Sequence, residues 1–220
     1  MSKFDITSFL LLRHYIAADL FRYMTSTKLK AWIRGWYIAG FRYTFFMRCC
    51  KYFAGKNFLF KPLFLFCRLA LRHYSVKYGF QIPWSTNIGP GLAIGHYGTI
   101  IVNPSAEIGV NCNISVGVLL GLNRKIGTDG RTAGFEYPSV GNRVSIGNNA
   151  KIIGGVHVAD ESIIGVSAVV IHDVEPKSVV VGIPGKVVSH EGSSAFVGSF
   201  HPWTEKFMNN IYDSNELYDE

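Results

Sequence analysis

The second half of the chain repeats an aliphatic residue at every sixth position, and this spacing constrains the fold more than any other feature. Three in-phase runs cover residues 88–170: Ile88, Ile94 and Ile100; Val102, Ile108, Ile114, Leu120 and Ile126; and Val140, Ile146, Ile152, Val158, Ile164 and Val170. A fixed six-residue period is typical of a β-helix, in which each hexapeptide forms one face of a triangular coil. We therefore expect the aliphatic side chains to stack inside the coils. The small residues that often follow them, such as Gly89 and Gly109, leave room for the chain to turn.

Composition and charge limit the class of protein. The 220 residues suffice for one repeat domain with an appendage, and a hydrophobic content of 48% excludes general disorder. The formal net charge of +7 lies mostly before residue 80 and favours an anionic partner, such as a phosphorylated cofactor or a membrane surface. Nucleic acid is not expected as a partner, because no recognisable binding module accompanies the charge.

The cysteines give an indication of the compartment. Cys49, Cys50, Cys67 and Cys112 show neither metal-ligand spacing nor the density of a disulfide scaffold. No cleavable signal peptide is recognised at Met1. We expect reduced, buried thiols in a cytoplasmic protein, with peripheral attachment to the inner face of the plasma membrane left open.

Residues 1–80 lack the repeat and are expected to form a helical region. A stripe at Phe9, Leu12, Ile16 and Leu20 predicts a first helix, with Thr7 or Ser8 as its N-cap. A second helix is expected over Leu29 to Phe53. A third should begin near Pro62 and end before Gly79. The apolar stretch 58–71 contains charged residues and is shorter than the ~20 residues of a bilayer span, so no transmembrane helix is expected.

Aromatic and basic residues alternate in this helical region, and two interpretations remain open. The cations include Arg34, Arg42, Arg48 and Lys51, which lie among Trp, Tyr and Phe side chains. These helices could form a cap that packs on the β-helix or on a second subunit. Alternatively, residues 28–78 could lie on an anionic membrane, with cations near the headgroups.

The remaining boundaries follow from breaks in the repeat. The β-helix is expected over residues 81–188, with a projecting loop at 121–139 that belongs to the working face. A last strand is expected at 179–181. Residues 189–220 have no repeat and are expected to form a tail that is a short helix, a strap or disordered.

One histidine lies in a position that suggests chemistry. His96 follows Ile94-Gly95 at a corner of an early coil, and its small neighbours leave the imidazole room to face outward. An unperturbed imidazole titrates near pH ~6.5, so it can accept a proton from a hydroxyl. A surface histidine without function is the alternative. His157 and His172 lie on later coils, but no histidine pair has a short ligand spacing, so no metal site is expected.

Several segments resemble the left-handed β-helix acyltransferases, and specifically their serine-acetyltransferase-like branch. They are Ile88-Gly89-Pro90-Gly91, Ile94-Gly95-His96, residues 146–152 and Val181-Gly182-Ile183-Pro184-Gly185-Lys186-Val187. Two further segments, residues 19–23 and 40–43, resemble members found with surface-polysaccharide genes. The resemblance implies a mainly β protein, a left-handed parallel β-helix behind an N-terminal helical region. It also implies that His96 takes the acceptor proton during transfer from acetyl-CoA.

The resemblance also implies a cofactor groove and an assembly. Acetyl-CoA would lie along the coils, where the residues that match the family's groove are Asn148, Val166, Ile171, His172 and Lys186. Only Lys186 has an independent argument, since a cation suits the phosphates. The family completes its groove with a neighbouring subunit, so a homotrimer is expected, with pairing of trimers through the N-terminal helices left open.

Departures from the serine enzymes guide the expected acceptor. By resemblance, Gln81 stands where they carry the carboxylate that orients the histidine, and Gly95 stands where they carry Asp. Glu136-Tyr137-Pro138 replaces Arg-His-Pro. Because a zwitterion needs both charges answered, we expect a neutral sugar hydroxyl instead, bound by Asn103, Glu136 and Tyr137. The expected acceptor is a bacterial capsular, O-antigen or exopolysaccharide, or its lipid-linked precursor. The alternatives are an L-serine O-acetyltransferase and a non-catalytic trimeric scaffold.

Overall fold

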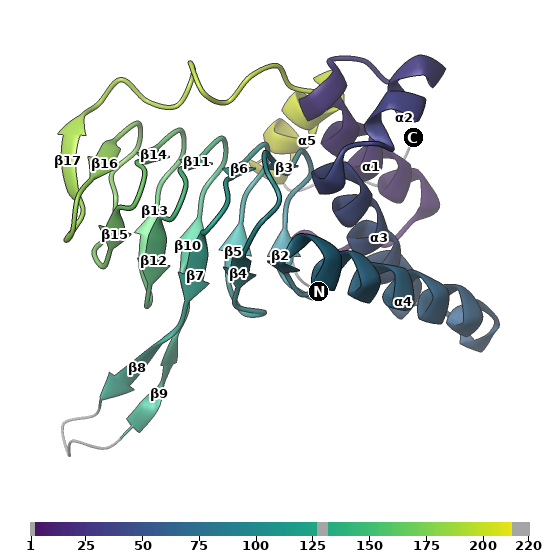
Figure 1. Cartoon of the computed structure of the whole chain (residues 1–220), viewed down its shortest axis with the longest axis horizontal. Coiled ribbons are helices and arrows are strands. Elements are labelled where there is room, and N and C mark those ends of the chain that lie inside the picture. The colour runs from purple at the N-terminus through teal and green to yellow at the C-terminus, as the bar shows by residue number, and fades with distance from the viewer. Residues whose placement is uncertain (1–2, 127–131, 213–220) are drawn as a thin grey trace.

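The computed structural model describes residues 3–126 and 132–212, as helices followed by a long stack of coils (Figure 1). The helices are α1 (Phe9–Met24), α2 (Leu29–Gly35), α3 (Ala39–Ala54), the short 3₁₀ turn η1 (Phe58–Phe60), α4 (Lys61–Tyr78) and α5 (Pro202–Tyr212). The strands before the projecting loop are β1 (Phe80–Gln81), β2 (Asn87–Ile88), β3 (Ala93–Ile94), β4 (Ile100–Val102), β5 (Glu107–Ile108), β6 (Asn113–Ile114) and β7 (Leu119–Gly121). The later strands are β8 (Asn123–Ile126), β9 (Thr132–Glu136), β10 (Ser139–Val140), β11 (Ser145–Ile146), β12 (Lys151–Ile153), β13 (His157–Val158), β14 (Ile163–Ile164), β15 (Val169–Val170), β16 (Val179–Val181) and β17 (Lys186–Ser189).

Two of the three expected helices are confirmed. Ser8 caps α1 by accepting a hydrogen bond from the Leu11 amide at 3.1 Å. Helix α4 ends at Gly79, whose φ of 78° is the left-handed conformation favoured after a helix. Within the described parts of the chain, no helix is long and apolar enough to cross a membrane.

The single helix expected from Leu29 to Phe53 is wrong, because the chain breaks between α2 and α3. Ile38 is extended, with φ −88° and ψ 122°. Two glycines on either side of the break make contacts that no side chain would allow. A Cβ on Gly35 would lie 2.3 Å from Leu20 Cδ1, and one on Gly40 would lie 2.5 Å from the carbonyl oxygen of Ile94. The break lets α2 pack beside Leu20 of α1 and lets the start of α3 pack on the coil at Ile94, which one continuous helix could not do.

The repeat forms a parallel β-helix, as expected. In the described residues, parallel strands stack into three sheets, β1-β4-β7-β12-β15, β2-β5-β10-β13 and β3-β6-β11-β14-β16. Strand register aligns the repeat positions: Ile94 pairs with Ile114, which pairs with Ile146, and Ile146 pairs with Ile164. These inward side chains are almost completely buried. The aliphatic stack is therefore the core of the coils.

The glycines after the aliphatic positions are needed because the coils stack backbone on backbone. A Cβ on Gly89 would lie 2.8 Å from the backbone of Gly109, and a Cβ on Gly109 would lie 2.4 Å from the carbonyl oxygen of Gly141. Larger residues at these positions would therefore push neighbouring coils apart. The left-handed backbone angles of the coils lie elsewhere, at residues such as Asn111 and Arg143, with φ of 59° and 55°.

The N-terminal helices close the open end of the β-helix through buried polar side chains. Asp19 on α1 accepts hydrogen bonds from the amides of Gly91 and Leu92, at 2.8 and 3.0 Å. Arg48 on α3 is paired with Asp19 at 3.0 Å and donates to the carbonyls of Ile88 and Gly89. Both side chains are buried. Backbone groups of the first coil, which have no preceding coil to pair with, thus find partners in the helices.

Three of the four cations that were expected near membrane headgroups are instead packed within this cap. Arg48 is buried, and Lys51 donates to the Thr86 carbonyl at 3.1 Å with 8% of its side chain exposed. Arg42 lies over the rings of Tyr74 and Tyr78 at 5.5 Å from each. Of the four cations expected near headgroups, Arg34 alone is exposed. Helix α3 is a packed cap, because it lies between the coils and α4.

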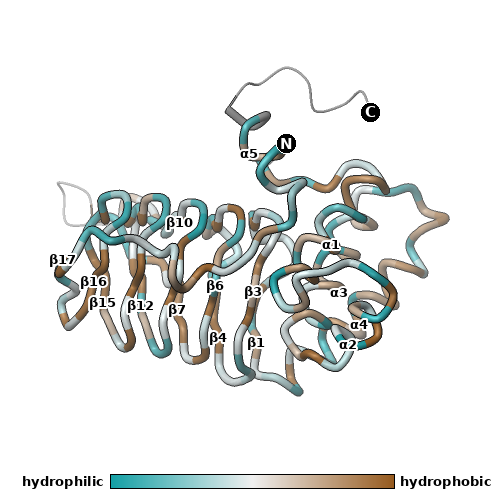
Figure 2. Tube along the Cα trace, turned by 90° about the horizontal axis from the view of Figure 1, so that it is seen from above, coloured by the Kyte–Doolittle hydropathy of each residue, from teal (hydrophilic) through white to brown (hydrophobic). Residues whose placement is uncertain are grey.

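The C-terminal segment forms a strap and a helix. Residues 190–201 run back along the coils from β17 to α5, as Figure 2 shows. The Ser193 amide donates to the Glu161 carbonyl at 2.7 Å, and Asn113 Nδ2 donates to the Phe196 carbonyl at 2.8 Å. Helix α5 then packs on α1, with the Trp203 ring stacked on His14 at 4.7 Å. The part of the expected tail at 213–220 lies outside the described residues.

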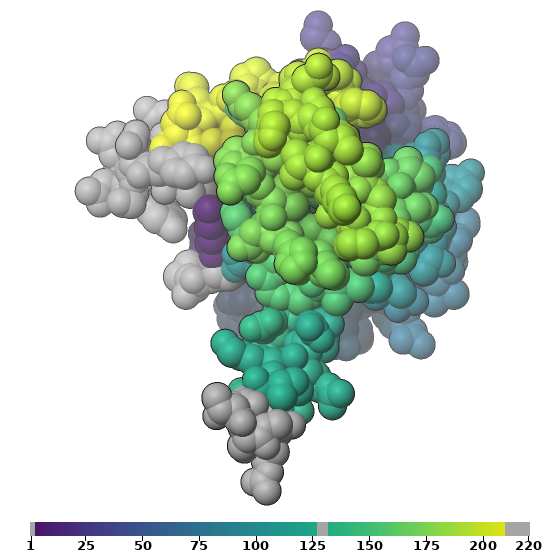
Figure 3. Space-filling view, turned by 90° about the vertical axis from the view of Figure 1, so that its left-hand side faces the viewer, coloured from purple at the N-terminus to yellow at the C-terminus, as the bar shows by residue number. Residues whose placement is uncertain are grey.

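The interruption of the repeat is an antiparallel hairpin. Strands β8 and β9 leave the coils after β7 and project from the body (Figure 3). Residues 127–131, within the expected loop 121–139, lie outside the described residues. Ile126, which was expected inside the coils, lies instead on hairpin strand β8 and is 55% exposed, because the chain leaves the coils after β7. Phe135 on β9 is 53% exposed. A projection of this kind is suited to contact another molecule or another subunit.

Candidate active site

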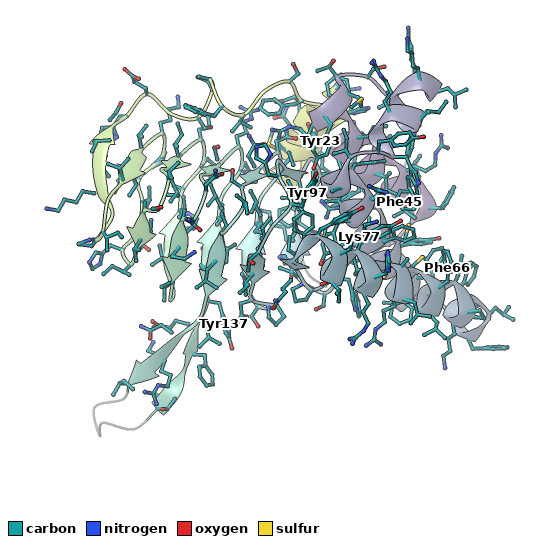
Figure 4. All side chains as sticks on the ribbon, viewed as in Figure 1. Tyr23, Phe45, Phe66, Lys77, Tyr97 and Tyr137 are labelled. Carbon is teal, nitrogen blue, oxygen red and sulfur yellow. The ribbon has the colours of Figure 1, made fainter. Side chains whose placement is uncertain are left out.

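His96 lies at an exposed corner between β3 and β4, beside the end of α4. A Cβ on Gly95 would have no atom within 4 Å, so the space before the histidine is open. The next ring, Tyr97, is 72% exposed and stacks on Tyr78 at 6.2 Å between centroids (Figure 4). The Gly98 amide donates to the Tyr78 carbonyl at 2.8 Å. The end of α4 therefore holds the corner that carries His96.

Glycine is required at the turn that follows His96. Gly98 has φ of 144°, and a Cβ there would lie 2.2 Å from Val116 Cγ2 on the next coil. On the other side of the histidine, the hydroxyl of Tyr23 accepts a hydrogen bond from the Ile94 amide at 2.7 Å. Burial raises the pKa of Tyr23, so this hydroxyl stays protonated and can also donate to the Ile94 carbonyl. The backbone around His96 is thus fixed from both ends.

The imidazole itself is exposed. No hydrogen bond joins it to another residue within 3–126 and 132–212. Gln81 is exposed on β1 and pairs with Ile101 of β4. It lines a cavity of about 620 Å³ between α4 and the first coil, together with Ser75, Ile82 and Trp84. An amide cannot supply the negative charge that a carboxylate would give to an imidazolium.

Strand register places most of the candidate residues along two edges of one sheet. His96, Asn148 and Val166 each follow a register-paired isoleucine by two residues, so they share the corner between the β3 and β4 sheets. Asn103 and Ile171 each follow the last paired residue of β4 and β15, so they share the opposite edge. The candidate base and the candidate cofactor residues therefore flank the sheet β1-β4-β7-β12-β15.

The final coils offer an exposed apolar surface that suits the alkyl part of a cofactor. Val166 and Ile171 are 69% and 47% exposed, and Ile183, which was not among the expected cofactor residues, is 74% exposed. His172 and Lys186 are also exposed. Ile183 could have been found from its place in the closing segment 181–187, where it lies between Gly182 and Pro184.

The expected acceptor residues do not meet His96 within one chain. The Oδ1 atom of Asn103 accepts a hydrogen bond from the Ser105 amide at 2.9 Å, so it serves a local turn. Tyr137 lies at the base of the hairpin, and Figure 4 shows it well apart from Tyr97, the residue that follows His96. Glu136 on β9 lies 3.8 Å from Lys125 on β8. Lys125 was missed because its pairing with Glu136 depends on the hairpin register.

The cysteines are reduced thiols in the protein interior. All four cysteines are free and buried, as expected. Burial raises the pKa of Cys112 to about 12, which keeps it a neutral thiol at cellular pH. Among the residues that the structure describes, no group of three or more His, Cys, Asp or Glu side chains could hold a metal ion.

Comparisons with known proteins point to one kind of enzyme. No family model matches the chain. It is 35% identical over 130 residues to serine acetyltransferase of Mycobacterium tuberculosis, covering 59% of this chain and 54% of that protein. It is 35% identical over 135 residues to serine acetyltransferase of Bacillus subtilis, covering 61% and 59%. The chain thus spans about half the length of these curated relatives.

Solved structures agree on the fold. A serine acetyltransferase of Neisseria gonorrhoeae superposes with a TM-score of 0.65 at 24% identity, covering 86% of this chain and 71% of that one. The soybean serine acetyltransferase apoenzyme gives a TM-score of 0.62 at 26% identity, covering 80% and 69%. The expected fold, a left-handed β-helix behind N-terminal helices, is confirmed.

These comparisons also correct the expected acceptor. The relatives and solved structures described above are serine acetyltransferases, so they agree with the serine-acetyltransferase-like resemblance. They do not support the finer resemblance to surface-polysaccharide O-acetyltransferases. The expectation of a sugar hydroxyl as acceptor, and of a role in polysaccharide biosynthesis, is wrong. The comparisons favour the alternative, L-serine, over the inference drawn from Gln81, Gly95 and Glu136.

Proposed function

We propose that the protein is an acetyl-CoA-dependent O-acetyltransferase whose acceptor is L-serine. The observation that supports this most strongly is His96, exposed at a fixed corner of a β-helix that superposes on serine acetyltransferases. Four relatives, whose alignments cover 51–61% of this chain, are named serine acetyltransferase. A hydroxyl acceptor needs a base within reach, and an exposed imidazole meets that need.

The residues of the final coils fit acetyl-CoA. The exposed side chains of Val166, Ile171 and Ile183 can pack against an alkyl chain. The exposed Lys186 can meet a phosphate as a charged donor. When bound there, acetyl-CoA supplies an acetyl group that is activated as a thioester.

His96 carries the proton steps. Its imidazole takes the hydroxyl proton of serine as the serine oxygen bonds to the acetyl carbon and the carbon–sulfur bond breaks. The imidazolium then returns the proton to the departing sulfur, which leaves as the thiol of CoA. The products are O-acetylserine and CoA, and His96 ends in its starting state.

The hairpin can answer the two charges of serine. Lys125 and Glu136 lie on the same face of β8 and β9, with 3.8 Å between Nζ and Oε1 and side-chain exposures of 65% and 41%. A cation and a carboxylate at this spacing complement the carboxylate and ammonium of an amino acid. They offer a substitute for the charges that the resemblance would have placed at Gly95 and at the Glu136-Tyr137-Pro138 segment.

The hairpin can act in this way only on another subunit. It projects from the coils and lies apart from the His96 corner of its own chain (Figure 4). We therefore propose a closed homotrimer in which the hairpin of one subunit reaches the His96 corner of the next. Mixing inactive His96→Ala with impaired Lys125→Gln subunits should restore part of the activity, because some corners then combine both intact groups. Failure of mixed trimers to regain activity would contradict the shared site.

The acceptor is tested by direct product analysis. Purified protein, acetyl-CoA and L-serine should yield O-acetylserine by mass spectrometry, with release of one CoA thiol per product. Ethanolamine, which lacks the carboxylate, should be a poorer acceptor for the wild type. Lys125→Gln should raise KM for L-serine and leave KM for ethanolamine almost unchanged. Absence of O-acetylserine, with acetyl-CoA intact in the mixture, would refute the proposal.

A further inference from the structure

The outer side of α4 is an exposed surface of apolar and basic residues that the proposed reaction does not use. We call this surface, together with η1, the α4 face. Its apolar side chains are 47–79% exposed: Phe58, Leu59, Leu63, Leu65, Phe66, Leu69 and Val76. Its cations are all exposed: Lys61, Arg68, Arg72 and Lys77. Seven exposed apolar side chains on one helix and the turn before it indicate an interaction site.

The charged side chains of the α4 face have one sign. From residue 20 to residue 106 the sequence contains no Asp and no Glu. Arg68 and Arg72 lie four residues apart and therefore on one side of the helix, next to Leu65 and Leu69. The partner of this surface must supply the negative charge.

This charge pattern argues against a second copy of the chain as the partner. In a twofold contact the same surface lies on both subunits, so the cations of one α4 face would meet those of the other. Because η1 and α4 carry no carboxylate, neither α4 face could neutralise the cations of the other. Like charges brought together in this way oppose association.

A cavity beside the α4 face has the same mixed chemistry. The space of about 620 Å³ described above is lined on the α4 side by Leu65, Leu69, Arg68 and Arg72. Its other wall is mainly apolar and includes Ile82 and Trp84 of the first coil. Such a cavity suits an apolar chain that carries an anionic group at its entrance.

We propose that the α4 face binds the surface of an anionic membrane. Exposed phenylalanine and leucine side chains would enter the interfacial zone, while Arg68 and Arg72 would meet phosphate groups. The adjoining cavity would accept an acyl chain of an anionic lipid. As Figure 1 shows, α4 extends beyond the coils at one end of the molecule, so a flat surface can reach its outer side. This membrane contact replaces the one first expected of Arg48 and Lys51, which are buried in the cap.

Vesicle flotation tests the proposal with the full chain. The protein should float with vesicles of phosphatidylcholine and phosphatidylglycerol, less with phosphatidylcholine alone, and less as salt is raised. Arg68→Gln with Arg72→Gln should lower the partition coefficient by roughly tenfold or more, since each cation near an anionic surface contributes several-fold. Leu59→Gln with Leu63→Gln should also weaken binding, although it removes no charge.

Matched variants on other surfaces separate this contact from general attraction to a basic protein. Arg13→Gln with Lys206→Gln removes two exposed cations from α1 and α5, and Val188→Gln with Phe196→Gln removes two exposed apolar side chains near the strap. Both controls should float like the wild type, and all variants should keep the wild-type circular dichroism spectrum. An equal loss in the controls would overturn the proposal, as would a wild type that does not float at low salt. A dimer that Leu59→Gln with Leu63→Gln dissociates, without vesicle binding, would assign the face to a second copy instead.

Discussion

Removal of the Asp19 carboxylate should be among the most damaging single changes to the cap. Asp19 accepts hydrogen bonds from Arg48 Nε at 3.0 Å and Nη2 at 3.2 Å, and from the amides of Gly91 and Leu92. Asp19→Ala leaves the Arg48 guanidinium buried without its counter-charge and leaves the two amides without an acceptor. Breaking a buried pair in this way costs about 3–5 kcal/mol. For a chain of this size, that corresponds to a fall in melting temperature of roughly 10 °C.

Two further variants test whether the unpaired charge is the cause. Asp19→Ala with Arg48→Met removes both charges, so it should recover part of the lost stability, as paired replacements by apolar residues do. Lys177→Gln, at a pair whose lysine is 63% exposed, should change stability by no more than about 0.5 kcal/mol. The assay is urea unfolding followed by circular dichroism at fixed protein concentration. A cost below about 1 kcal/mol for Asp19→Ala, the range of surface pairs, would refute the reasoning.

Two other predictions concern the cap and the corner. Burial, followed by the nearby Arg48, lowers the pKa of Lys51 to about 8 from its ordinary 10.5, so the unfolded chain binds more protons between these values. The free energy of unfolding of the wild type should therefore rise by roughly 1–2 kcal/mol from pH 8 to 10, relative to that of Lys51→Met. Urea titrations of both proteins measure this change, and equal pH dependence in the two would exclude a buried ammonium at Lys51. Gly98→Ala should cost about 1–3 kcal/mol and lower serine acetylation, because its φ of 144° and the 2.2 Å approach to Val116 leave no room for a Cβ. Wild-type melting and turnover in that variant would mean that the His96 corner is not held by this turn.

The sequence predicted the coils well because their period reports directly on packing. Each inward residue from Ile88 to Val170 meets its equivalent one coil away, so the spacing contains the strand register. The helix ends at Ser8 and Gly79 could also be predicted from the sequence, since local capping decides them. The break between α2 and α3 could not be predicted from the sequence, because it depends on the tertiary contacts of Gly35 and Gly40.

Only part of the candidate site could be predicted from the sequence. The corner suggested His96 and the family resemblance selected it. Lys125 could not be selected, because only the hairpin register brings it to Glu136. Arg48 and Lys51 looked like surface cations, because partners distant in sequence, such as Asp19 and Thr86, are not visible in a local pattern. The acceptor was misjudged for a related reason: matching single positions to a family assumes that the same positions supply the charges.

The most direct test of the account is the turnover of His96→Ala with L-serine and acetyl-CoA. If His96 is the base, kcat should fall by about 10²–10⁴, while acetyl-CoA binding and the melting temperature stay at wild-type values. His73→Ala, which removes another exposed histidine, on α4, should leave kcat unchanged. Wild-type serine acetylation by His96→Ala would contradict the central claim.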